Sequence, residues 1–148
     1  MSEHFTLTAV KARAPSLLRL EFADGQRFEL DVAPLIRRYR ALFPLADPAV
    51  FATAALGEGG GSVVWSRDGD LELAADNLRA RAVEAAGGYS HEFIWNWMAR
   101  HHLTLDAAAE AIGVSRRMLA YYRSGKKPLP RTVALACRDW EAGGRRAA

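Results

Sequence analysis

The spacing of apolar residues changes at Gly87-Gly88. Before this point apolar and polar residues alternate in short runs, as at Leu18, Leu20 and Phe22, which is typical of strands with one buried face. After it, apolar residues recur at steps of three and four residues, which is typical of helices. We therefore expect an α+β chain whose first part is β-rich and whose second part is all helical.

This change predicts two small domains in the 148 residues. We expect residues 1–86 to form a β-rich α+β domain, residues 87–142 a helical domain, and residues 143–148 a flexible tail. Half of the residues, 50%, are apolar, which suffices for two small cores. No apolar run approaches the ~18 residues of a membrane span, and the N-terminus lacks the features of a secretory signal. These features, together with a single cysteine, predict a cytoplasmic protein that makes no membrane contact.

The net charge of +3 is unevenly distributed. Residues 1–86 carry ten Lys and Arg against twelve Asp and Glu, for −2, whereas residues 87–148 carry ten against five, for +5. A basic module joined to a nearly neutral one is typical of proteins that bind polyanions, most often nucleic acid.

A hairpin is predicted where Asp24-Gly25 separates two alternating runs. A loop of Asp24-Gly25-Gln26 would place Phe22 opposite Phe28, with Leu20 opposite Leu30 and Arg19 opposite Asp31. A two-residue loop would instead pair Phe22 with a charged residue. The preferred register has one cost, because it sets Glu21 opposite Glu29 on the solvent face.

The rest of the first domain reads as short elements. A helix is expected over residues 33–40, a turn at Asp47-Pro48, strands near residues 52–56 and 63–65, and a helix over residues 75–83, with a linker at 85–88. The glycine-rich residues 57–62 are interpreted as a connection, because a P-loop would need a following Lys-Ser or Lys-Thr and a helix.

In the order of its parts, this half resembles a bacterial domain family of unknown function that has a small β-rich fold. The resemblance covers about residues 5–80 and is carried by Leu20-Glu21-Phe22-Ala23-Asp24-Gly25, Asp31-Val32-Ala33-Pro34-Leu35, residues 43–51 from Phe43-Pro44 to Val50-Phe51, and Gly61-Ser62-Val63-Val64-Trp65. It implies an architecture and no activity.

Four helices are expected after residue 90. Thr104 and Ser115 are suited to cap the second and third helices at their N-termini, and Gly113 and Gly125 follow the same two helices. A fourth helix is expected from about Arg131. Two short capped helices joined by a glycine-containing turn predict a helix-turn-helix.

The helical half is similar to the lambda-repressor-like (Xre-type) helix-turn-helix class over about residues 91–141. The similarity is carried by Ala109, the turn Gly113-Val114-Ser115 and the closing Ser124-Gly125-Lys126. It implies double-stranded DNA as the partner and a transcriptional regulator as the function. The chain departs from the class at Leu105, where the class has a phosphate-contacting Gln, and at Arg123, where an acidic residue is common.

The third helix carries the candidate DNA contacts, because the N-terminus of a recognition helix enters the major groove. Base contacts are expected from four exposed residues: Arg116, Arg117, Ala120 and Tyr121. Phosphate contacts are expected from flanking cations and hydroxyls: Thr104, Ser115, Arg123, Lys126, Lys127 and Arg131.

Other chemistries find little support in the sequence. A zinc site would draw on His91, His101, His102 and Cys137, but these residues lack the spacing of a zinc site. No serine lies in a Gly-x-Ser-x-Gly elbow. Cys137 lies on an apolar helix stripe, so we expect it to be buried. We therefore expect no metal, no cofactor and no enzymatic activity.

Trp95 lies outside the apolar stripe of its helix, which makes it a candidate interface residue. A homodimer is expected, because helix-turn-helix proteins usually bind two half-sites. The N-terminal domain could also bind an unknown protein partner. The alternative function is a protein-interaction or antitoxin-like adaptor in which Leu105, Tyr121 and Trp95 form an apolar surface and no DNA is bound.

Overall fold

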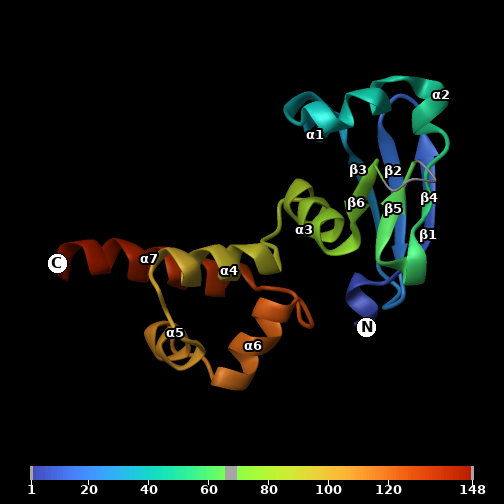
Figure 1. The fold of residues 1–148 in the computed structure, drawn as a ribbon. Helices are drawn as coiled ribbons and strands as arrows, with labels where there is room; N and C mark the ends of the chain where they lie inside the picture. Colours follow the sequence, from blue (N-terminus) through green and yellow to red (C-terminus); the bar gives the residue numbers. More distant parts are fainter. Residues whose placement is uncertain (1, 66–69, 148) are drawn as a thin grey trace. The chain divides into compact units, whose positions relative to one another are not determined.

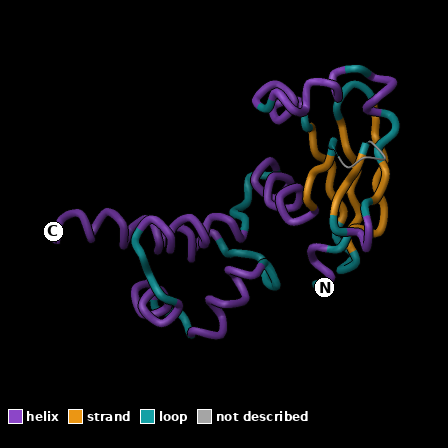
Figure 2. The backbone as a smooth tube through the Cα atoms, viewed as in Figure 1, coloured by secondary structure: helices purple, strands orange, loops and turns teal. Residues whose placement is uncertain are grey.

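The computed structural model describes residues 2–65 and 70–147. The chain divides into two compact units, residues Met1–Ala82 and Val83–Ala148, which we call the N-terminal unit and the C-terminal unit (Figure 1). The strands of the described residues all belong to the N-terminal unit, as Figure 2 shows. The chain is therefore mixed α+β, with a β-rich region followed by a helical one, as the sequence predicted.

The first sheet is antiparallel and has the strand order β1-β2-β3. Its strands are β1 (Leu7–Arg13), β2 (Leu17–Phe22) and β3 (Arg27–Asp31). The alternation in β2 buries Leu18, Leu20 and Phe22, each at most 2% exposed, and places the intervening residues on the other face.

The register of the β2–β3 hairpin differs from the predicted one. Phe22 donates its backbone N–H to the carbonyl of Gln26 at 2.9 Å, and Leu20 lies opposite Phe28 rather than Leu30. The loop is Ala23-Asp24-Gly25, and Gly25 has a φ of +89°. A glycine in the left-handed region is what a three-residue hairpin loop requires at its third position. Because β3 is shifted by two residues, each side chain keeps its predicted face.

The two-residue shift also changes the charge pairs of the solvent face. Arg19 lies opposite Glu29 with 3.2 Å between Nε and Oε1, and Arg27 lies opposite Glu21 with 3.5 Å between Nη2 and Oε1. The predicted contact between two glutamates is therefore wrong, and so is the pairing of Arg19 with Asp31. Two opposite-charge pairs occupy the face instead, which is the favourable arrangement for cross-strand neighbours.

The remaining elements of the N-terminal unit are short. The helices are η1 (Glu3–Phe5), α1 (Ala33–Arg38), η2 (Arg40–Ala46), α2 (Pro48–Phe51), η3 (Glu58–Gly60) and α3 (Ala75–Ala85). The second sheet is antiparallel, and its strand order is β4 (Ala55–Leu56), β5 (Ser62–Val64) and β6 (Glu72–Ala74). Asp47 caps α2 by accepting the N–H of Ala49 at 3.0 Å. The strands β1 and β6 and the helices η1 and η2 were not predicted, because none of them has a clear apolar period.

Gly60 brings η3 against β1. A Cβ built on Gly60 would lie 2.3 Å from the carbonyl oxygen of Leu7, and the φ of Gly60 is +72°. Any side chain would therefore push the glycine-rich segment away from the first sheet. This packing requirement, rather than ligand binding, accounts for a glycine at this position.

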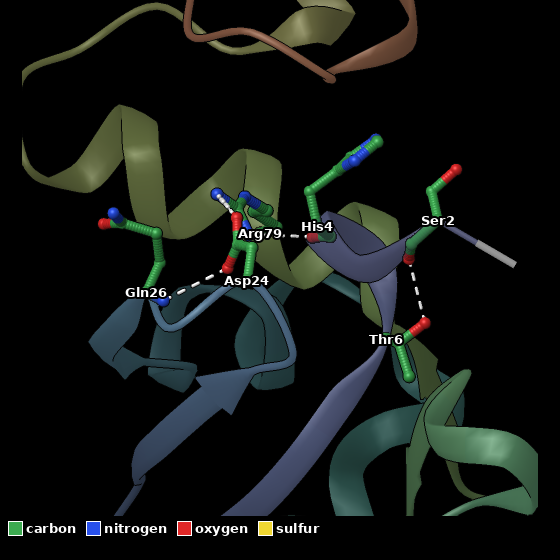
Figure 3. Close-up of polar contacts among 6 residues, drawn as sticks. All are labelled: Ser2, His4, Thr6, Asp24, Gln26 and Arg79. Carbon is green, nitrogen blue, oxygen red and sulfur yellow. Dashed lines mark hydrogen bonds and ion pairs between the residues drawn. The ribbon is translucent and has the colours of Figure 1, made fainter.

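Arg79 of α3 ties three distant segments of the N-terminal unit together (Figure 3). Its guanidinium donates to the carbonyl of His4 at 2.8 Å and lies 2.8 Å from a carboxylate oxygen of Asp24 in the hairpin loop. It also stacks over the rings of Phe22 and Phe28, with its Cζ 4.9 Å and 5.4 Å from the ring centroids. Only 15% of the Arg79 side chain is exposed, so the charge is shielded from water and held by these partners.

Asp24 is held in its ionised form by this arrangement. Burial alone would raise its pKa, but the hydrogen bonds from Arg79 and from the backbone N–H of Gln26, with the nearby charges of Arg79 and His4, lower the pKa below its ordinary 3.8. The pKa of Asp31 is also lowered, chiefly by the hydroxyl of Ser16 at 2.6 Å. Both carboxylates therefore stabilise the fold only while they are charged.

The glycines predicted as a linker end α3. Gly87 has a φ of +90°, and the N–H groups of Gly87 and Gly88 donate to the carbonyls of Glu84 and Val83, both at 3.0 Å. This is the hydrogen-bond pattern of a Schellman cap, which stops a helix at a glycine in the left-handed region. The glycines are therefore ordered by hydrogen bonds, and the division between the units falls four residues earlier, inside α3.

Four further helices lie in the described residues of the C-terminal unit, and Figure 1 labels each of them. They are α4 (His91–Arg100), α5 (Leu105–Ile112), α6 (Arg116–Ser124) and α7 (Arg131–Ala147). The four predicted helices are thus confirmed. Residues 143–147, predicted as a tail, continue α7, and Ala148 lies outside the described residues.

One apolar core joins these helices. Ile94, Trp97, Leu119 and Cys137 have no exposed surface, and the Trp97 ring meets Trp140 edge to face at 5.6 Å. The burial of Cys137 agrees with the prediction, and desolvation raises the pKa of its thiol to about 11. A thiol with this pKa stays protonated at neutral pH and is a poor nucleophile.

We expect Gly60→Ala to destabilise the chain more than Gly25→Ala. Both residues have positive φ, which costs alanine about 1 kcal/mol, but a Cβ at Gly25 would meet no atom within 4 Å. At Gly60 the backbone of β1 must also move, so we expect a loss of about 3 kcal/mol. Urea unfolding followed by circular dichroism measures both, and equal losses would contradict the close approach.

The Arg79–Asp24 pair predicts acid sensitivity. Because the pKa of folded Asp24 lies below its ordinary 3.8, the pair stabilises the fold fully above about pH 4 and loses this contribution as the pH falls through the folded pKa. Arg79→Met should lower the unfolding free energy by about 1–2 kcal/mol at pH 7 and make its decline below pH 4 shallower. The matched control is Arg81→Met, since Arg81 bonds the amide oxygen of Asn77 instead of a carboxylate. An unchanged acid limb in Arg79→Met would contradict the assignment.

Candidate nucleic-acid interface

The helix α6 is fixed at both ends by local hydrogen bonds. The Ser115 hydroxyl accepts the backbone N–H of Met118 at 3.0 Å, and Gly125 ends the helix with a φ of +79°. Leu119 has no exposed surface and anchors the inner face of α6 in the core. The opposite face therefore presents Arg116 and Arg117 to solvent, as the sequence predicted.

Tyr121 lies at the centre of three cations. Arg117 Nε donates to the Tyr121 hydroxyl at 2.8 Å, and the Arg117 Cζ lies 5.5 Å from the centroid of the Tyr121 ring. The Nζ atoms of Lys126 and Lys127 lie 4.7 Å and 5.3 Å from the same centroid. We call these four residues the Tyr121 cluster. It brings together residues predicted separately as base and phosphate contacts.

The cations of the cluster change the pKa of the Tyr121 phenol. Its pKa is lowered, first by the hydrogen bond from Arg117 and then by the charges of Arg117, Lys126 and Lys127, while partial desolvation acts in the opposite direction. The three cations beside the phenol would also attract an anion such as a phosphate.

The turn after α6 places the two lysines. The backbone N–H of Lys127 donates to the carbonyl of Tyr121 at 3.3 Å, and that of Lys126 lies 3.4 Å from the Ser124 hydroxyl oxygen. These bonds fold the loop back over the last turn of α6 at Gly125. The spacing of the basic residues along the sequence did not predict that the two lysines lie beside Tyr121, because this position depends on the left-handed conformation of Gly125.

Arg116 is held more loosely than Arg117. Its Nε lies 3.6 Å from Asp106 of α5, and the two side chains are 66% and 75% exposed. An ion pair this exposed contributes little and exchanges readily with other partners. Arg116 is therefore free to turn toward a ligand.

The other predicted phosphate contacts are not members of the Tyr121 cluster. The hydroxyls of Thr104 and Ser115 accept N–H groups at the starts of α5 and α6, at 3.1 Å and 3.0 Å, which leaves their hydroxyl hydrogens available to donate. Arg131 is exposed at the first residue of α7. Ala120, which was predicted to be an exposed base contact, is instead partly buried, because it follows the buried Leu119 on α6. Leu105 is partly buried against the core of the unit.

Arg123 lies apart from the Tyr121 cluster and contacts Trp95 instead. Its Cζ is 4.7 Å from the centroid of the Trp95 ring, which is 51% exposed. A groove of about 360 Å³ adjoins this pair, lined by Trp95, Met98, Ala99, His102, Leu103 and Arg123. The sequence identified Trp95 as an interface candidate but did not predict this groove. A signal was present, because Met98 and Ala99 follow Trp95 by three and four residues and so lie beside it on one face of α4.

Two other features are absent from the described residues. Among residues 2–65 and 70–147, no group of three or more His, Cys, Asp or Glu side chains is arranged to hold a metal ion. Within the same residues, no helix combines the length and the apolar character that a membrane span needs.

Comparisons with known proteins address both units. The chain is similar to the crystal structure of a "putative DNA binding protein" from Nitrosomonas europaea, with 46% sequence identity, a TM-score of 0.87, and coverage of 96% of this chain and 91% of that one. No curated protein matches the chain. Residues 7–84 match the model of a family described as "protein of unknown function (DUF2442)", in agreement with the resemblance found in the first half of the sequence. The chain therefore belongs to the DUF2442 family.

Proposed function

We propose that this chain is a cytoplasmic, sequence-specific DNA-binding regulator of transcription and not an enzyme. In this proposal the C-terminal unit is a helix-turn-helix of the lambda-repressor-like (Xre-type) class, and α6 enters the major groove of double-stranded DNA. The observation that carries the proposal is the Tyr121 cluster beside the exposed start of α6, where Arg117, Lys126 and Lys127 converge on one ring. The Nitrosomonas europaea protein, described as putatively DNA-binding, supports the same function.

Each part of the surface has a distinct role in this proposal. Guanidinium groups at the start of α6 contact base edges, since Arg matches the O6 and N7 acceptors of guanine. Lys126, Lys127 and Arg131 neutralise phosphates, which fixes the position of α6 without reading the sequence. The hydroxyls of Thr104 and Ser115 donate to phosphates from the starts of α5 and α6. Arg123 adds positive charge near the groove beside Trp95.

Leu105 bears on the alternative adaptor function. It packs partly against the core and is not among the residues that line the groove beside Trp95. Tyr121 is engaged by cations instead of belonging to an apolar surface. The surface that an adaptor would use is thereby reduced to the groove beside Trp95, which favours DNA as the partner of α6.

Trp95 supports the proposal of a homodimer. A tryptophan that is 51% exposed beside a groove is a typical interface residue, because it buries much apolar area on contact. A twofold dimer would present two copies of α6 to two half-sites. The N-terminal unit, as a DUF2442 domain, remains available for a separate protein partner or signal.

We expect the chain to bind mixed-sequence duplexes at low salt in a fluorescence-anisotropy titration. If about four cations neutralise phosphates, log K should fall against log salt with a slope of about −3.6. Arg116→Ala with Arg117→Ala should weaken binding at least tenfold. The matched control is Arg19→Ala with Arg27→Ala, which removes the same charge from exposed arginines of the N-terminal unit. No binding, or equal weakening by both double variants, would refute the proposal.

The homodimer is tested by sedimentation equilibrium at micromolar concentration without DNA. We expect a mass of two chains, shifted toward one chain in Trp95→Ala because the exposed ring is lost. Phe43→Ala is the control, since Phe43 is a similarly exposed aromatic residue at 53%. A mass of one chain for the unmodified protein would rule out this dimer.

A further inference from the structure

The two arginines at the start of α6 differ in how they are held. Arg117 Nε donates to the Tyr121 hydroxyl at 2.8 Å, and its guanidinium lies over the Tyr121 ring. Arg116 lies 3.6 Å from Asp106, and both of these side chains are exposed. Arg117 is therefore oriented before any ligand arrives, whereas Arg116 is free to adapt.

The hydrogen bond to Tyr121 determines which donors of Arg117 remain. A guanidinium has five N–H donors, and the one on Nε is occupied by the Tyr121 hydroxyl. The four that remain are on the two terminal nitrogens, Nη1 and Nη2. Arg117 can therefore make a bidentate contact only end-on, through Nη1 and Nη2 together.

The ring of Tyr121 is itself engaged. The ammonium groups of Lys126 and Lys127 lie 4.7 Å and 5.3 Å from its centroid, within the range of cation–π attraction. The hydroxyl is bonded to Arg117. The side chain thus holds three cations in place and has little surface left for a base.

We propose that Tyr121 is a positioning residue that holds Arg117 for end-on recognition of guanine. This inference rests on the proposed DNA-binding function and narrows it, because it names one residue and one base. Guanine presents two acceptors, O6 and N7, to the major groove, which match the two terminal nitrogens. Adenine presents a donor at N6 beside N7, and a guanidinium has no acceptor to meet it.

Holding Arg117 in advance also favours selectivity. A long flexible side chain loses rotamer freedom when it is fixed at an interface, and prior fixation reduces this cost on binding. A fixed guanidinium also cannot reorient to accommodate another base. The expected result is a stronger preference for guanine, with little change in non-specific affinity.

The test begins with selection of duplexes from a pool with a random 20-base-pair segment by the full-length chain. The most enriched duplex and its guanine-to-adenine variant are then titrated by fluorescence anisotropy. We expect the guanine duplex to bind about tenfold more tightly. Tyr121→Phe, which keeps the ring and loses the hydroxyl, should reduce this ratio about fivefold, the effect of one lost hydrogen bond.

Two further variants distinguish a role of Tyr121 in positioning Arg117 from a role in folding. Arg117→Lys should abolish most of the preference for guanine while keeping the charge. Tyr122→Phe makes the same chemical change at the next residue, which packs partly against the core, and should leave the ratio unchanged. The slope of log K against log salt should be the same for Tyr121→Phe and the unmodified chain, because no charge is removed.

The outcomes distinguish this inference from the function on which it rests. If the unmodified chain enriches no sequence and binds no duplex, both the DNA-binding function and the inference fail. If the chain binds and selects, but the selected sites lack guanine at a fixed position, the inference alone is overturned. It is also overturned if Tyr121→Phe keeps the full ratio.

Discussion

The short turn between α5 and α6 is the constraint on which the C-terminal surface depends. Gly113 takes a φ of +73° at the end of α5, and two residues later Ser115 already caps α6. With only Val114 between them, the direction of α6 is set by these two local conformations. Leu119 then enters the core, so that the exposed face of α6 carries both arginines and Tyr121. The position of the candidate interface is therefore set by the helix caps on either side of Val114.

Features that depend on residues close together in the sequence were predicted better than features that depend on pairing between strands. The helices α5 and α6 could be located because their caps lie next to the helix ends, and α4 and α7 because their apolar residues recur at steps of three and four. The β2–β3 hairpin was predicted with the right faces but with β3 shifted by two residues, because alternation has a period of two and does not distinguish such registers. The shift was decided by Gly25, whose positive φ selects the loop.

The candidate site was predicted as a set of residues but not as an arrangement. The basic residues after Gly125 were visible in the sequence, whereas their return to Tyr121 required the turn itself. Arg123 was grouped with the phosphate contacts because it is basic, and its contact with Trp95 depends on the packing of α4 against α6. The role of Arg79 was missed for a similar reason, since its hydrogen-bond partner His4 is 75 residues away in the sequence.

The cations of the Tyr121 cluster and several arginines of the N-terminal unit have different partners, and the partner decides how much positive charge remains exposed to a ligand. In the N-terminal unit Arg19, Arg27 and Arg79 each contact a carboxylate, so much of their charge is neutralised within the fold. In the C-terminal unit the cations of the Tyr121 cluster and Arg123 lie against aromatic rings. A ring orients a cation through its quadrupole but has no net charge, so the positive potential persists. The positive charges of the Tyr121 cluster and of Arg123 are thus oriented without being neutralised, and they remain available to a polyanion.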